Sequence, residues 1–202
     1  MTLQKILNEY NIEIPKDKYI LEYFVENEKF NVFNMDFLPK ITPRKNIWKF
    51  SQIEVFYQET LSKPKLREEY IRLEWKYINV LIKLWVYSDV FVISDSIYAN
   101  SKMLKKCIER KYKKYIRSIL KDVDTQSMVE ATEKEIMEFY SMLGVRNLAN
   151  VVYYFKDLHA LIFTNWSCFS IVFLKEEHFD FVKKVVESEG LFLRENETTL
   201  YS

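Results

Sequence analysis

Glycine is almost absent from this chain: Gly144 and Gly190 are the only two in 202 residues. Loops that hold phosphate groups or dinucleotides need several glycines close together, because the backbone has to approach the anion. The sequence therefore excludes a glycine-rich phosphate-binding loop. It also excludes the nucleotide-dependent activities that such a loop would indicate.

Histidine and cysteine are equally rare, with two of each. His159, His178, Cys107 and Cys168 lie too far apart in the sequence to form a zinc motif, so we expect no metal site. The cysteine spacing is not that of a disulfide framework, which favours a reducing intracellular setting. Cys168 lies in an apolar segment that would raise its thiol pKa, so we interpret it as a core residue and not as a nucleophile activated by His159.

The sequence thus indicates no catalytic residue and no cofactor. An active site built from dispersed carboxylates, tyrosines and lysines would leave no recognisable motif, so an enzyme of that kind stays an alternative. We lean toward a protein without catalytic activity.

An excess of one charge is also missing, because 30 Lys and Arg residues balance 29 Asp and Glu residues. Any attraction to nucleic acid or to a membrane surface therefore has to be local. Charged residues begin at Lys5, too early for the apolar core of a signal peptide. The longest apolar run, residues 77–93, includes Lys83 and Asp89 and is shorter than the ~20 residues of a bilayer span. We expect a cytoplasmic, intracellular protein that does not enter membranes.

Helical patterns fill the first three quarters of the chain, and β patterns fill the rest. We predict an α+β fold in a single domain, 1–202, with a helical part over about 1–145 and a β-rich part over about 146–202. The sheet would have one face left over after a single C-terminal helix packs on it. Amphipathic helices from upstream would cover that face.

Caps, prolines and apolar spacing predict the N-terminal helices. Thr2 can cap a short helix, and Pro15 can open a second one. Residues 30–48 indicate an extended connection, and residues 51–54 have the spacing of a capping box. Apolar residues at three- and four-residue steps then predict a long helix over 65–87.

The pattern changes character between that helix and Gly144. Residues 90–93 fit either a short buried strand or a continuation of the long helix. A second capping box at 132–135 predicts a helix that ends with Gly144 in the left-handed conformation.

Beyond Gly144, β-branched and aromatic runs alternate with turn residues. Residues 151–155, 160–163 and 168–173 predict a three-stranded antiparallel meander. A helix over about 176–188, closed by Gly190, and a last strand over 191–193 follow.

The segment 102–121 shows the sharpest local pattern, because it combines an apolar stripe with a dense basic face. Apolar residues recur at helical spacing from Met103 to Leu120, and Glu109 is the only acidic residue of the segment. We predict one continuous helix whose basic face binds a partner. The candidate binding residues are Lys102, Lys105, Lys106, Arg110, Lys113, Lys114, Arg117 and Lys121.

Several interpretations of this basic face stay open. The acidic segment 122–138 could neutralise it internally through Glu130, Glu133 and Glu138, or its lysines could simply be solvated. A negatively charged protein partner or nucleic acid could also offset the repulsion among the cations.

We expect a binding protein that acts through protein–protein contacts, as an inhibitor, immunity protein or antitoxin does. A nucleic-acid-binding accessory protein that uses the helix 102–121 is the alternative. The missing catalytic motifs and the high content of aromatic residues favour the first interpretation, since exposed Tyr and Trp often carry protein interfaces. The abundance of Lys, Ile, Asn, Phe and Tyr is typical of a low-GC microbe or its phage.

Overall fold

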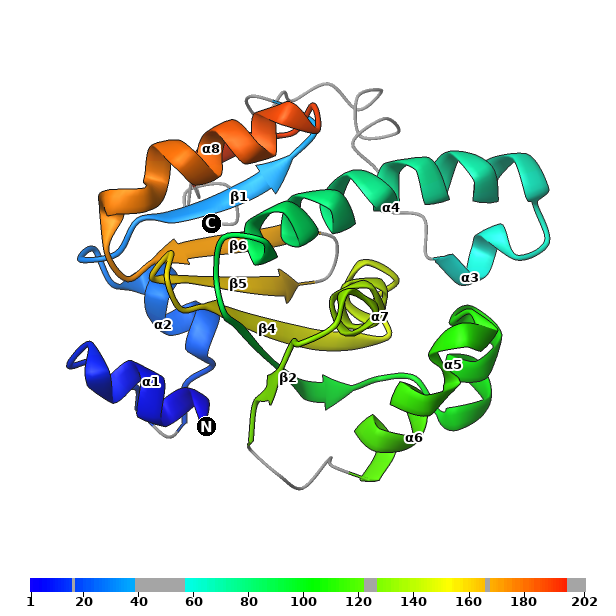
Figure 1. The fold of residues 1–202 in the computed structure, drawn as a ribbon, viewed down its shortest axis with the longest axis horizontal. Helices are drawn as coiled ribbons and strands as arrows, with labels where there is room; N and C mark the ends of the chain where they lie inside the picture. The colour runs from blue at the N-terminus through cyan, green and yellow to red at the C-terminus, as the bar shows by residue number, and fades with distance from the viewer. Residues whose placement is uncertain (16, 39–56, 122–126, 166–167, 196–202) are drawn as a thin grey trace.

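An antiparallel sheet of seven strands forms the centre of the protein. The computed structural model describes residues 1–15, 17–38, 57–121, 127–165 and 168–195 (Figure 1). The strand order is β3-β2-β4-β5-β6-β1-β7. The strands are β1 (Val32–Asp36), β2 (Val90–Ile97), β3 (Val129–Glu130), β4 (Ala149–Phe155), β5 (Ala160–Asn165), β6 (Cys168–Phe173) and β7 (Phe192–Glu195).

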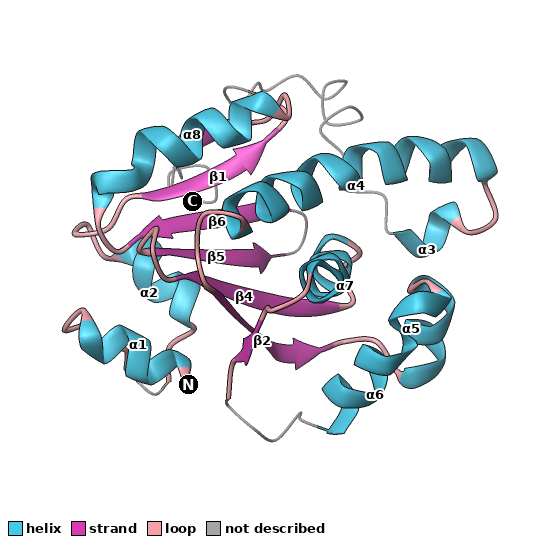
Figure 2. Ribbon diagram, viewed as in Figure 1, coloured by secondary structure: helices cyan, strands magenta, loops and turns pink. Residues whose placement is uncertain are grey.

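Helices pack on both faces of this sheet (Figure 2). The α-helices are α1 (Leu3–Glu9), α2 (Ile20–Glu26), α3 (Tyr57–Thr60), α4 (Pro64–Trp85), α5 (Ser101–Cys107), α6 (Lys113–Lys121), α7 (Lys134–Val145) and α8 (Phe179–Ser188). Short 3-10 turns η1 (Arg110–Tyr112) and η2 (Glu176–His178) precede α6 and α8. The α+β class predicted from the sequence is therefore confirmed.

Strand β4 contributes apolar side chains to both faces of the sheet. Its odd-numbered residues, such as Tyr153, join the larger core with α4, α7 and α8, while Val152 and Tyr154 join the smaller core with α1 and α2. Successive side chains of a strand point to opposite faces, and both sets are apolar here. Both faces of the sheet are consequently buried under helices. Upstream helices cover the face that a single C-terminal helix would leave exposed.

The C-terminal predictions are confirmed. Strands β4, β5 and β6 form the antiparallel meander, with Val152 opposite Phe163 and Ile162 opposite Ile171. The η2–α8 segment follows, and β7 closes the sheet edge by pairing with β1. Gly190 has φ +70 at the end of α8, which is the left-handed position expected of it.

The predicted helical layout of the N-terminal part is partly wrong. Strand β1 lies within the segment interpreted as an extended connection, and residues 90–93 begin the eight-residue strand β2. Both strands pair with the C-terminal meander, so pairing with distant strands decides their conformation. The helix expected after Pro15 starts later, at Ile20, because a turn closed by Lys18 N donating to Pro15 O comes first.

Some of the predicted helix caps are present in the structure, and one is absent. Thr2 caps α1, where its Oγ1 accepts from Lys5 N at 3.3 Å, and Pro64 begins α4 as expected. Helix α7 begins without the predicted capping box: Glu133 takes the N-cap position instead of Thr132, and its carboxylate accepts from Tyr115 Oη and caps no helix amide. The capping box at residues 51–54 lies outside the described residues.

Gly144 does not have the predicted left-handed conformation. It lies within the last turn of α7, and Asn147 takes the positive φ of 52° instead. A Cβ atom at position 144 would lie 2.5 Å from Thr164 Cγ2. Gly144 is therefore required for the close approach of α7 to β5, and not for a turn.

Replacing Gly144 with Ala should lower the free energy of unfolding. Alanine favours the helix by up to ~1 kcal/mol over glycine, but overpacking against Thr164 costs ~1–3 kcal/mol, so we expect a net loss. Urea unfolding of the Gly144→Ala variant measures it, with Glu135→Ala on the exposed first turn of α7 as the control. An unchanged or raised free energy of unfolding would contradict this prediction. It would show that β5 shifts away from position 144 at no energetic cost.

Candidate functional site

The basic segment 102–121 is not one helix. Helix α5 ends at Cys107, Ile108 and Glu109 are extended with ψ of 136° and 149°, and η1 leads into α6. The apolar side of the segment is nevertheless buried as predicted, at Leu104, Ile108 and Ile116 among others. Leu120 departs from the predicted stripe, since it is 39% exposed.

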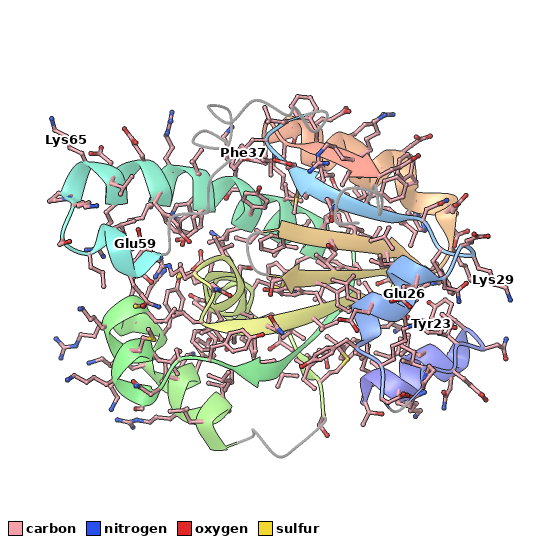
Figure 3. The ribbon with its side chains drawn as sticks, turned by 180° about the vertical axis from the view of Figure 1, so that it is seen from behind. Tyr23, Glu26, Lys29, Phe37, Glu59 and Lys65 are labelled. Atoms are coloured by element: carbon pink, nitrogen blue, oxygen red, sulfur yellow. The ribbon has the colours of Figure 1, made fainter. Side chains whose placement is uncertain are left out.

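The side chains of the candidate binding residues lie on the outside of this segment. Figure 3 shows side chains that end in nitrogen projecting outward from α5 and α6. Lys121 ends α6, and its side chain is not described. The exposed members are Lys102, Lys105, Lys106, Arg110, Lys113, Lys114 and Arg117. We call the outer face of α5, η1 and α6 the basic surface.

Among the described residues, internal neutralisation reaches two lysines of this segment. Lys114 pairs with Glu133 at 3.4 Å, and Lys111 pairs with Glu138 at 3.1 Å. The remaining exposed cations of the basic surface form no ion pair with any residue that the structure describes. They are Lys102, Lys105, Lys106, Arg110, Lys113 and Arg117.

Glu138 is held beside this segment by hydroxyl and ammonium donors. Tyr112 Oη donates to its carboxylate, and Lys111 and Lys134 flank it. Burial raises the pKa of the Glu138 carboxyl, but these donors outweigh that effect and hold the pKa below its usual value. Glu138 is thus an ionised internal anchor for the helices beside the basic surface.

The lowered pKa of Glu138 makes stability depend on acidity. A carboxylate favoured by the folded state stabilises it above the unfolded pKa of about 4.5, and this contribution is lost as the pH falls through the lower folded pKa. We expect Glu138→Gln to cost about 1–3 kcal/mol at pH 7 and much less at about pH 3. Urea unfolding at both pH values tests this, with the exposed Glu187→Gln as the control; an equal loss at both would contradict it.

A buried ionic cluster lies behind the basic surface. Arg146 follows α7, is 1% exposed, and donates to both carboxylate oxygens of Glu74 on α4 at 2.7 Å. It also donates to the Glu109 carboxylate at 2.9 and 3.2 Å and to the backbone carbonyl of Cys107. Its guanidinium lies 4.1 Å from the ring centroid of Tyr57 on α3. Glu109, on the break of the basic segment, is thereby tied to the core.

The charge state of this cluster follows from its contacts. Burial lowers the pKa of the Arg146 guanidinium, but Glu74 and Glu109 raise it above its usual value. Burial also raises the pKa of Glu74, and the paired guanidinium opposes that shift. The cluster holds no activated nucleophile, because burial raises the pKa of the Cys107 thiol as well.

The sequence analysis missed this cluster, although one signal was present. Glu74 lies on the apolar stripe of α4, four residues after Tyr70 and three before Tyr77. A carboxylate there has to be buried, and a buried carboxylate requires a cationic partner. The partner Arg146 could not be identified, since it lies 72 residues away in the sequence.

A second polar cluster surrounds His159 in the turn between β4 and β5. Its Nδ1 lies 2.6 Å from Tyr10 Oη, and its Nε2 lies 3.1 Å from Glu177. Tyr10 Oη is also 3.0 Å from Tyr154 Oη, and the His178 ring stacks at a centroid distance of 6.2 Å. His159 has φ 48, a left-handed conformation that histidine tolerates in turns.

This cluster ties α1 to the sheet and is not paired with a thiol. Cys168 pairs with Asn165, whereas His159 lies beyond the other end of β5, next to Ala160. The register of the meander therefore places Cys168 and His159 at opposite ends of β5. Burial lowers the pKa of His159, and Lys175 adds to the effect.

A lowered pKa at His159 predicts a loss of stability on mild acidification. The folded state favours the neutral ring, so this contribution is complete above the unfolded pKa of about 6.5 and declines as the pH falls below it. His159→Asn, which tolerates the left-handed backbone, should flatten the change in unfolding free energy between about pH 7 and 5. Urea titrations measure this slope, and His178→Asn is the control; an unaltered slope in His159→Asn would refute the assignment.

Within the described ranges, no group of three or more His, Cys, Asp or Glu residues could hold a metal ion. None of the described helices combines the length and apolar character needed to cross a membrane.

Comparison with protein-family models, with curated proteins and with solved structures finds no match.

Proposed function

We propose that the protein binds an acidic surface of another protein through its basic surface and has no catalytic activity of its own. The observation that carries this proposal is the set of exposed cations on both α5 and α6 that form no ion pair within the described part of the chain. Like charges at helical spacing repel one another, and a complementary anionic partner removes that cost. In this role the protein would act as an inhibitor, immunity protein or antitoxin of a low-GC microbe or phage.

Exposed apolar side chains at the margins of the basic surface favour a protein partner. Tyr98, three residues before α5, is 54% exposed, and Leu120 at the end of α6 is 39% exposed. Protein interfaces combine such apolar contacts with Arg and with a polar rim, whereas phosphate backbones offer little to an apolar side chain.

The N-terminus of α5 gives no support to a phosphate site. The N-terminus of α5 is occupied, because Asn100 Oδ1 accepts from Met103 N at 2.9 Å. Helices α5 and α6 span only 7 and 9 residues, which is short for a helix that reads a DNA groove. Nucleic acid nevertheless remains the second candidate, because the cations alone would also attract phosphates.

Charge reversal on the basic surface should abolish association and leave the fold intact. The variant Lys106→Glu, Arg110→Glu, Lys113→Glu and Arg117→Glu changes only exposed positions, so its melting temperature should stay close to that of the wild type. The matched control reverses the exposed lysines Lys5, Lys29, Lys183 and Lys184 elsewhere on the protein.

Zero-length carbodiimide cross-linking in host extract identifies the partner, because it joins lysine amines to carboxylates in direct contact. We expect cross-links from the lysines of the basic surface to Asp or Glu of one protein, whose purified form then binds the wild type and the control but not the charge-reversed variant. Steeply salt-dependent binding to duplex or single-stranded nucleic acid, without such a protein, would favour the second candidate. Equal binding by all three forms would reject the site.

A further inference from the structure

The break between α5 and α6 is a feature of the basic surface that its own sequence does not explain. Apolar residues keep helical spacing across it, and no Gly or Pro lies between Ser101 and Lys121. A segment of this kind ordinarily continues as a single helix. The cause of the break therefore lies outside the segment.

Arg146 supplies that cause. In an uninterrupted helix the carbonyl of Cys107 would accept from the amide of Lys111, four residues on. In this structure the Cys107 carbonyl accepts from Nη1 of Arg146, while Ile108 and Glu109 are extended. The same guanidinium binds the Glu109 carboxylate, so the side chain at the break turns inward. A long-range hydrogen bond has replaced the local one.

Arg146 can impose this geometry because it is itself fixed. Its bidentate bond to Glu74, which is 0% exposed, and its stacking on Tyr57 leave the guanidinium little freedom. The planar fork of arginine directs its donors to several acceptors at once, which a lysine ammonium does not reproduce. The core therefore dictates how α5 sits relative to α6.

We propose that Arg146 is a positioning residue for the basic surface. By capturing the Cys107 carbonyl and the Glu109 carboxylate, it breaks the helix and holds the cations of α5 and those of α6 in one fixed arrangement toward an acidic partner. Without it, residues 101–121 revert to the continuous helix that their sequence favours, and the cations take a different arrangement, along one face of a single axis. The role in binding rests on the proposed function, whereas the cause of the break does not.

The double variant Glu74→Leu with Arg146→Met tests this inference, because it removes one buried charge of each sign and leaves the net charge unchanged. Replacement of a buried ion pair by apolar side chains is compatible with folding. Cα chemical shifts of Ile108 and Glu109 report their conformation, and a polyglutamate peptide is the binding probe. We expect these shifts to change from extended to helical values and the affinity for polyglutamate to fall about threefold or more.

Glu109→Gln is the matched control. It removes one negative charge beside the cations, and the Cys107 carbonyl can still accept from Arg146. The break should persist in this variant, and its affinity for polyglutamate should equal or exceed that of the wild type. If charge alone governed binding, the double variant would bind as the wild type does, because the two removed charges are in direct contact and cancel.

Extended shifts at Ile108 and Glu109 in the folded double variant would overturn the inference. Helical shifts with unchanged affinity would overturn the positioning role in binding. If the double variant does not fold, Arg146→Lys replaces it and should show the same change of shifts at the break. A wild type that fails to bind polyglutamate would contradict the proposed function, while the chemical shifts would still decide what causes the break.

Discussion

The buried guanidinium of Arg146 is the interaction on which the arrangement of the helices depends. It joins the end of α7 to α4 through Glu74, to α5 through the Cys107 carbonyl and to α3 through Tyr57. An unpaired charge in a protein interior costs several kcal/mol, so any packing that separates these partners is strongly disfavoured.

The sheet places Arg146 where it can act. Helix α7 packs on β4 and approaches β5 so closely that position 144 has no room for a Cβ atom. Arg146 follows two residues later, and the backbone carbonyl of Val145 between them accepts from Tyr70 Oη of α4 at 2.8 Å. The close packing that requires Gly144 thereby places Arg146 where it can bind the surface segment that contains α5 and α6.

Beside the basic segment, acidic side chains are held toward the core while basic side chains face solvent. Glu109 accepts from the buried Arg146, and the buried Glu138 accepts from Tyr112 and Lys111, so both carboxylates are held toward the core. The outer cations remain exposed to solvent. A chain with almost no net charge can therefore present a strongly basic surface, because attraction to a partner depends on the local field and not on the total charge.

The sequence by itself determined the parts of the fold that rest on local pattern. The meander, the long helix α4, the α8 segment and the caps at Thr2 and Gly190 follow from side-chain periodicity and turn chemistry, which act within a few residues. The exposed basic residues followed in the same way from the spacing of the apolar stripe.

Only the tertiary structure decided the rest. Strands β1 and β2 form because the meander offers unpaired edges, Gly144 is needed because of Thr164, and the basic helix is broken because Arg146 takes a carbonyl from it. Each of these contacts joins residues far apart in the chain, and a periodicity confined to one segment contains no information about a partner elsewhere.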